Sequence, residues 1–160
     1  MKPTTMTPPN ETRFTVRFAE TDMAGVYHHS NTFVWFEAGR FAFIERMIGG
    51  QPMIEVAGAP IFAPVTKTRV TFKGFGRFGD ELRLETFIKP QETTKLVFYY
   101  RLTKLADGSV VALGMTEHVT LVEGNRFLFR WPDTVQERMK AFFRENPAAL
   151  TDGSDFDVKL

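Results

Sequence analysis

The segment NTFVWFEAGRFAFIERMI, residues 31–48, decides the fold, because its length and composition favour a helix and nothing in it interrupts one. It contains no proline, and Gly49-Gly50 followed by Pro52 forms a strong stop signal. We therefore predict one long helix over these residues.

The sequence after this helix has the two-residue period of strands, from residue 60 to residue 122. The predicted strands are residues 65–73, 81–89, 95–105 and 110–122, with Asp107-Gly108 as the hairpin between the last two. An earlier strand at 13–18 places Phe14, Val16 and Phe18 on one face. One strand, one helix and four antiparallel strands predict an α+β fold, a five-stranded sheet wrapped around the helix.

The domain boundaries follow from composition at the two ends. Residues 1–11 are rich in proline and polar side chains, so we expect a disordered lead-in, and the single domain covers residues 12–146. A short amphipathic helix begins near Pro132 and is closed by Asn146-Pro147. Residues 147–160 form an acidic C-terminal tail that we expect to fray.

Composition excludes several classes of function. The 160 residues include no cysteine, which rules out disulfides, thiolate nucleophiles and cysteine-ligated metals. Twenty basic and 19 acidic residues leave a net charge of +1, so nothing favours a nucleic-acid partner or an anionic membrane surface. We expect a cytoplasmic protein with no membrane insertion. The 17 phenylalanines indicate either a phenylalanine-rich core or side chains that line a pocket or an interface.

The predicted helix carries two charges within its apolar half. A helical wheel places on that half Phe33, Val34, Phe36, Phe41, Phe43, Ile44, Met47 and Ile48, and places Trp35, Ala38, Gly39, Ala42 and Arg46 opposite. Glu37 and Arg40 fall inside the apolar half, three residues apart, and can pair across one helical turn. Such a pair either shapes the helix and a subunit contact or serves a pocket, and spacing alone leaves both interpretations open.

The loop before the helix gathers polar side chains that can carry chemistry. Asp22 can act as a general base towards water or as a nucleophile towards an acyl carbon. We also expect free backbone N–H groups near His29 to Thr32 to favour developing negative charge. The alternatives are structural: Asp22 as a loop cap, Ser30 or Asn31 as a helix N-cap, and adjacent histidines as ordinary loop residues. A three-histidine metal site that includes His118 is disfavoured, because neighbouring side chains diverge.

The run from Arg17 to Arg40, RFAETDMAGVYHHSNTFVWFEAGR, closely resembles the signature of hotdog-fold acyl-CoA thioesterases of the 4-hydroxybenzoyl-CoA thioesterase and YbgC-like type. The signature is an aspartate, a glycine three positions on, an asparagine nine positions on, and a helix that opens with aromatic-Phe-Glu and then an arginine. The residues that fit it are Asp22, Gly25, His29, Asn31, Glu37 and Arg40. Thr32 departs from it, since an aromatic residue is common at that position.

The resemblance implies a hotdog fold and the hydrolysis of an acyl-CoA to a free acid and CoA, with no metal or other cofactor. It implies that Asp22 is the nucleophile or general base and that the backbone amide at His29 polarises the thioester carbonyl. Gly25, His28, Asn31 and Glu37 would then contact the substrate, at a site between subunits of a homodimer or homotetramer. The alternatives are a non-catalytic acyl or lipid binder, a thioesterase acting on acyl carrier protein, and a structural dimerisation module.

Overall fold

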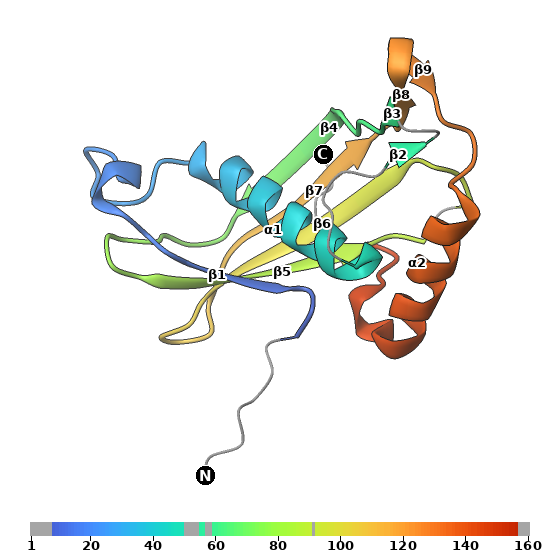
Figure 1. Ribbon diagram of the computed structural model, residues 1–160. Coiled ribbons are helices and arrows are strands. Elements are labelled where there is room, and N and C mark those ends of the chain that lie inside the picture. The colour runs from blue at the N-terminus through green and yellow to red at the C-terminus, as the bar shows by residue number, and fades with distance from the viewer. Residues whose placement is uncertain (1–7, 50–54, 57–58, 91, 157–160) are drawn as a thin grey trace.

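A curved antiparallel sheet wraps around one central helix, α1 (Asn31–Ile48), in the computed structural model of the protein (Figure 1). The structure describes residues 8–49, 55–56, 59–90 and 92–156. The strands, in their order across the sheet, are β1 (Glu11–Thr15), β5 (Glu81–Ile88), β6 (Leu96–Lys104), β7 (Val110–His118) and β4 (Val65–Phe72). This is the hotdog arrangement, and the predicted α+β fold is confirmed.

The boundaries of α1 agree with the prediction, but the first strand is shorter than predicted. β1 ends at Thr15, and Phe18 begins the 3-10 helix η1 (Phe18–Glu20) with 75% of its surface exposed. The chain bends here because the Glu20 carboxylate accepts hydrogen bonds from the Arg17 backbone and side chain. In the sequence the alternation of apolar residues continues to Phe18, whereas the turn ends the strand at Thr15.

The predicted strand over residues 110–122 is divided in two. β7 ends at His118, and β8 (Leu121–Val122) pairs with β9 (Arg126–Phe127) on the far side of the short 3-10 helix η2 (Glu123–Asn125). Another two-stranded ladder joins β2 (Glu55–Val56) to β3 (Ala59–Pro60). Both small ladders extend the end of the molecule that lies away from β1 (Figure 1).

The buried face of α1 differs from the helical-wheel prediction. Trp35 and Gly39, expected on the opposite side, are buried, whereas Val34 and Phe41 are 61% and 47% exposed. The face with Gly39 packs on the sheet because glycine allows β5 to approach closely. A Cβ atom at position 39 would lie 2.4 Å from Leu84 Cδ2. Hydrophobicity alone does not detect such a requirement for a small residue.

The C-terminal part of the chain covers one end of the sheet (Figure 1). α2 (Asp133–Glu145) begins at the predicted place and packs on α1, with the rings of Phe142 and Phe43 5.5 Å apart. After the 3-10 helix η3 (Pro147–Ala149), the Thr151 amide donates to the Ile88 carbonyl, and Phe156 is 2% exposed. The expected fraying is therefore wrong up to Phe156, because burying this ring stabilises the segment.

The predicted lead-in falls mainly on residues 1–7, which lie outside the described residues. Glu11, its last residue, already belongs to β1, and its carboxylate pairs with Arg13 at 2.9 Å. In the part of the chain that the structure describes, neither α1 nor α2 has the length and apolar character needed to cross a bilayer.

Candidate active site

The loop from Thr21 to Ser30 joins η1 to α1 at one end of the helix (Figure 1). Its two arms meet in a bridge between Thr21 and Tyr27, and the Asp22 amide donates to the Val26 carbonyl at 2.9 Å. The Tyr27 amide donates to the Gly76 carbonyl, which ties the loop to the connection before β5. The loop is thus held by the scaffold on both sides.

Asp22 is exposed and follows directly on the bridge between Thr21 and Tyr27. Its Oδ1 accepts a hydrogen bond from the Ala24 amide at 2.8 Å, and its carbonyl accepts one from the Gly25 amide at 3.0 Å. Gly25 has a φ of 75°, a left-handed conformation that this tight turn requires. Within the described residues Oδ2 has no hydrogen-bond or ion-pair partner. One carboxylate oxygen caps the loop, and the other is available for chemistry.

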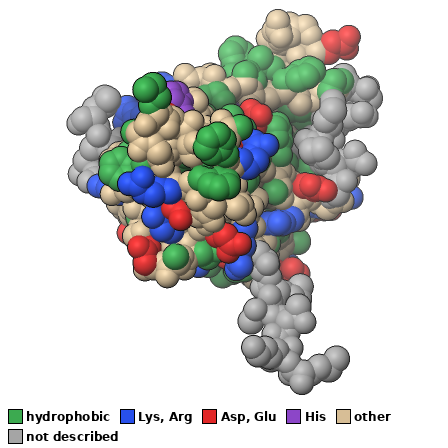
Figure 2. Space-filling view, turned by 90° about the vertical axis from the view of Figure 1, so that its left-hand side faces the viewer, with side chains coloured by type: hydrophobic (Ala, Val, Ile, Leu, Met, Phe, Trp, Pro, Cys, Tyr) green, Lys and Arg blue, Asp and Glu red, His purple; other side chains and the backbone are tan. Residues whose placement is uncertain are grey.

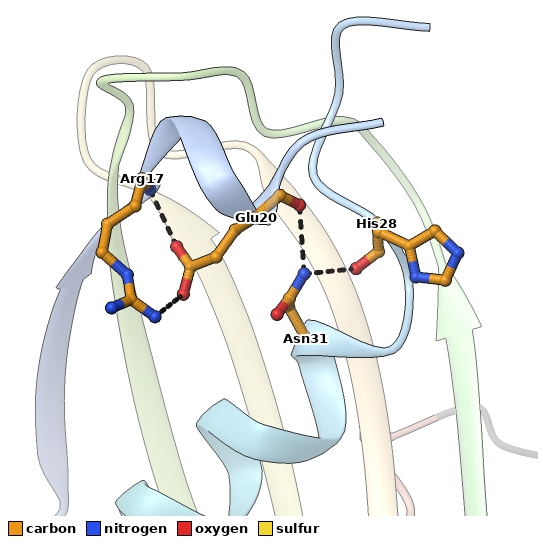
Figure 3. Close-up of polar contacts among 4 residues, drawn as sticks. All are labelled: Arg17, Glu20, His28 and Asn31. Atoms are coloured by element: carbon orange, nitrogen blue, oxygen red, sulfur yellow. Dashed lines mark hydrogen bonds and ion pairs between the residues drawn. The ribbon is translucent and has the colours of Figure 1, made fainter. Parts of the chain in front are cut away.

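Glu20 and Asn31 fasten the base of the loop (Figure 3). The Asn31 side-chain amide donates to the carbonyls of Glu20 (3.0 Å) and His28 (3.2 Å), so it joins the two arms of the loop just where α1 begins. The Glu20 carboxylate is bound by Arg17, with the two charged groups 2.9 Å apart. Burial raises the pKa of Glu20, but the hydrogen bonds from Arg17 outweigh it, so the pKa lies below the usual range.

The two histidines differ in their contacts. His28 Nδ1 lies 2.8 Å from the Ser30 hydroxyl, and its backbone amide donates to the Glu20 carbonyl at 2.7 Å. The His29 ring lies 4.2 Å from the His28 ring and 6.4 Å from the Phe72 ring, measured between centroids. Ser30 precedes the helix without making a side-chain cap, since its hydroxyl contacts His28 instead.

The helix start offers fewer free amides than expected. The amides of Asn31, Thr32 and Phe33 donate to the carbonyls three residues earlier, because the chain enters the helix through a tight turn. The backbone N–H of His29, by contrast, has no acceptor among the described residues. The Ser30 amide donates to His28 Nδ1 at 3.3 Å, so within the described part of the chain the expected set near His29 to Thr32 is reduced to this single amide, in the same loop as Asp22.

Glu37 lies on α1, away from the loop, and the structure brings it to Arg40 rather than to Asp22. The two charged groups are 3.8 Å apart, with 61% of the Glu37 side chain exposed and 8% of that of Arg40. The predicted pairing is confirmed, but only one member of the pair is buried. Glu37 faces outward, where a second molecule can reach it.

Exposed apolar side chains gather at the loop end of the molecule, together with basic and acidic ones (Figure 2). Phe18, Met23, Phe75 and Phe78 are all more than half exposed, and the rings of Phe18 and Phe78 meet edge to face at 5.9 Å. Other phenylalanines, such as Phe36 and Phe43, fill the core. The phenylalanines of the chain therefore divide between the core and the surface. No group of three or more histidine, aspartate or glutamate side chains suited to a metal ion occurs among the described residues.

Sequence reasoning missed Arg17 and Glu20 as the residues that position the loop. Their spacing is a recognisable signal, because a glutamate three residues after the first capping position closes a short helical turn. Asn31 was singled out as a substrate contact, yet its amide is already used to hold the loop.

Comparison with known proteins places the chain in a family. The model of the thioesterase-like superfamily matches residues 16–139. The chain belongs to this superfamily. The matched region includes Asp22, His29, α1 and all the sheet strands except β1.

Individual relatives agree with this assignment. A Bacillus subtilis (strain 168) protein, YneP, named as a candidate acyl-CoA thioesterase, is 30% identical over 87 residues, which are 54% of this chain and 62% of that protein. The match thus spans less than two thirds of the relative.

Two solved structures share the fold. Hypothetical protein TT1821 from Thermus thermophilus has a TM-score of 0.71 and 35% identity, over 82% of this chain and 98% of its own. A DHNA-CoA thioesterase from Staphylococcus aureus has a TM-score of 0.71 and 23% identity, over 87% and 93% of the two chains. At 23% identity, the similarity to the Staphylococcus aureus enzyme shows a shared fold and nothing more.

Proposed function

We propose that this protein hydrolyses acyl-CoA thioesters to a free acid and CoA, with Asp22 as the nucleophile or general base. The proposal rests on one loop in a chain of the thioesterase-like superfamily. Judged on the described residues, this loop holds an exposed carboxylate, Asp22, with one oxygen that has no partner, and a backbone amide, that of His29, with no acceptor. A carboxylate and an oxyanion donor are the two groups that acyl transfer requires.

The chemistry can follow either of two balanced routes. As a base, Asp22 takes a proton from water while the water oxygen attacks the carbonyl carbon. As a nucleophile, it attacks that carbon itself and forms an anhydride that water then hydrolyses. In both routes the carbon–sulfur bond breaks and the CoA thiolate takes up a proton. The His29 amide stabilises the negative oxygen that forms on the carbonyl.

The substrate contacts belong to the same proposal. We assign Gly25 and His28 to the walls of the site beside Asp22, and Glu37 to a contact from the neighbouring chain. Asn31 contributes chiefly by holding the loop, through its bonds to Glu20 and His28. We place the protein nearest to the 4-hydroxybenzoyl-CoA thioesterase and YbgC-like type, on the signature from Arg17 to Arg40.

We also propose a homodimer or homotetramer that works in the cytoplasm, with the site between subunits. β4 is an edge strand, and its outer residues Val65 and Phe72 are 49% and 47% exposed. An edge strand with exposed apolar residues favours pairing with a second copy. This arrangement would cover the apolar surface near the loop.

A thiol-release assay over a panel of CoA thioesters tests the activity. The panel should contain acetyl-, octanoyl-, palmitoyl-, benzoyl- and 4-hydroxybenzoyl-CoA, with an octanoyl acyl carrier protein for comparison. We expect at least one CoA thioester to be hydrolysed with kcat/KM above ~10⁴ M⁻¹s⁻¹. Binding of the thioesters without release of thiol from any of them would favour a non-catalytic acyl binder. Release of thiol from the acyl carrier protein alone would show that the protein is an acyl-carrier-protein thioesterase.

We expect the reaction to need no metal, because the chain has no cysteine and only three histidines, two of them adjacent. Turnover of the best substrate should therefore be the same after dialysis against EDTA. Loss of turnover that added zinc restores would contradict a metal-free mechanism.

A further inference from the structure

A cavity lies away from the loop, between the C-terminal half of α1, the sheet and α2. Its volume is about 270 Å³, and most of its wall is apolar, with Ile44, Phe98, Trp131 and Met139 among the lining residues. Among the described residues that line it, the polar side-chain groups come from Arg40, His118 and the indole of Trp131. The cavity therefore combines an apolar body with very few polar groups, as sites for small ligands do.

His118 has no hydrogen-bonding capacity left for a ligand. Its Nδ1 lies 2.8 Å from the Ala63 carbonyl, which can only accept, so Nδ1 carries the proton. Its Nε2 then accepts from the Thr116 hydroxyl at 2.9 Å, and Thr116 accepts from Tyr100 at 2.7 Å. Burial lowers the pKa of His118 to about 4, which keeps the ring neutral at physiological pH.

Arg40 ends this chain of hydrogen bonds and still has donors to offer. Its side chain is 8% exposed, and NH1 donates to the Tyr100 hydroxyl at 3.3 Å. Its nearest carboxylate, on Glu37, lies 3.8 Å away, beyond hydrogen-bond distance and largely in solvent. The Phe41 ring lies 5.6 Å from the guanidinium carbon. A guanidinium has five donors, and burying it is costly unless an anion pairs with it closely.

We propose that this cavity binds an apolar monocarboxylate, with the carboxylate on Arg40 and the hydrocarbon against the apolar wall. A cavity of about 150 Å³ holds a benzene ring of six carbons. On that scale, 270 Å³ accommodates about ten non-hydrogen atoms, the size of octanoate or of a small substituted benzoate. A neutral molecule of the same shape would leave Arg40 with only its ion pair to the exposed Glu37 carboxylate, 3.8 Å away.

The cavity is distinct, within one chain, from the loop that holds Asp22. Arg40 follows Asn31 by nine residues, which is about 13 Å along a helix axis. The proposed hydrolysis would release an acid of this kind, an apolar monocarboxylate. Only this connection between the cavity and the reaction rests on the proposed function. The binding inference itself stands without it, because it depends only on Arg40 and the apolar wall.

Equilibrium binding to the full-length protein tests the inference without any turnover. Trp131 lines the cavity, whereas Trp35 is buried against Phe14 and Tyr27, so tryptophan fluorescence should respond to a ligand that enters. We expect saturable binding of octanoate, and binding of octan-1-ol at least ~10-fold weaker, since a charge-assisted hydrogen bond contributes that much. Equal affinity for acid and alcohol, or no saturable binding of octanoate or 4-ethylbenzoate, would overturn the proposal.

Two variants and a control locate the site. Arg40→Gln should weaken octanoate binding at least ~10-fold and leave octan-1-ol unaffected, because only the charge is removed. Arg46→Gln, the same change on the same helix but outside the cavity, should leave both affinities unchanged. Ile44→Phe, which keeps Arg40 and fills the cavity, should weaken the binding of both ligands. Unchanged octanoate binding in either Arg40→Gln or Ile44→Phe would show that octanoate binds elsewhere.

The test also separates this inference from the proposed function. A protein that binds octanoate in this way but releases no thiol would refute the proposed function alone.

Discussion

Asp22 shows how one side chain can satisfy a structural and a chemical interpretation together. The Asx turn through Oδ1 is the loop cap expected as the structural alternative, and Oδ2, which has no partner among the described residues, is the oxygen that the proposed catalysis needs. These roles use different oxygens, so the loop cap does not argue against the catalytic one. It also fixes the carboxylate in place, which lowers the entropy cost of holding it beside a substrate.

His118 should make the stability of the protein depend on pH. The neutral ring is favoured in the fold, where burial lowers its pKa to about 4, while the unfolded chain takes up a proton near 6.5. The unfolded state therefore binds more protons in this range, and stability rises with pH. We expect the free energy of unfolding in urea to fall by about 2 kcal/mol between pH 7 and pH 5.

A variant without the imidazole provides the control for this dependence. His118→Gln cannot titrate, so its unfolding free energy should change much less over the same interval. Carboxylates such as Glu20 and Glu117 have lowered pKa values and lose their contribution only at more acidic pH. Equal slopes for the two proteins would show that the buried ring is not the source.

At the scale of elements, α1 is close to the sheet at Gly39 and Gly114, where an added Cβ atom would lie 2.4 Å from a neighbouring side chain. A Cβ atom on Gly114 of β7 would lie 2.4 Å from Phe36 Cε2 and 3.1 Å from the Arg69 carbonyl. Phe36 cannot move aside, because it is buried and stacks on Tyr100 at 4.2 Å. On Gly39 the nearest atom is the tip of the flexible Leu84 side chain.

The two glycines should therefore respond differently to alanine. Gly114→Ala should cost about 2 to 3 kcal/mol of unfolding free energy through overpacking. Gly39→Ala should cost less, because Leu84 can shift and alanine gains about 1 kcal/mol of helix propensity. Urea unfolding of both variants measures the difference, and an equal or smaller loss for Gly114→Ala would contradict this account of the packing.

The elements themselves were largely predictable, whereas their burial was not. α1 was predicted to the residue, because an uninterrupted run and a glycine stop are local signals. The positions of Trp35 and Gly39 on the buried face depend on where the sheet curves, which no local pattern records. The docking of Phe156 against Phe87 and Tyr99 is likewise a contact between distant parts of the chain.

The candidate site was predicted to a similar degree. The signature around Asp22 and His29 located the loop, but it could not show which amide stays free, because that depends on the tight turn into α1. Arg40 was recognised as a charge in an apolar face. Its cavity with α2 could not be foreseen, since α2 lies far away in the sequence.

At the scale of the molecule, the apolar residues on the β4 edge predict self-association. Light scattering at micromolar concentration should give a mass at least twice the 18.3 kDa of one chain. Thr68→Pro, in the middle of β4, should weaken an association through this edge, because proline offers no N–H for pairing. A wild-type mass near that of a single chain would contradict both the dimer and a site shared between subunits.

The central claim is that Asp22 carries the chemistry, and the turnover of Asp22→Asn on the best CoA thioester tests it most directly. Asparagine keeps the Oδ1 acceptor for the Ala24 amide, so the loop should hold its shape, which circular dichroism and light scattering would check. His28→Ala and His29→Ala, as comparisons, should lower kcat by no more than ~10-fold, because the backbone amide remains. We predict that Asp22→Asn lowers kcat at least ~100-fold with little change in KM, since an amide can neither attack the acyl carbon nor accept the proton of water. A folded Asp22→Asn protein with turnover close to that of the wild type would contradict the account and leave Asp22 as a loop cap.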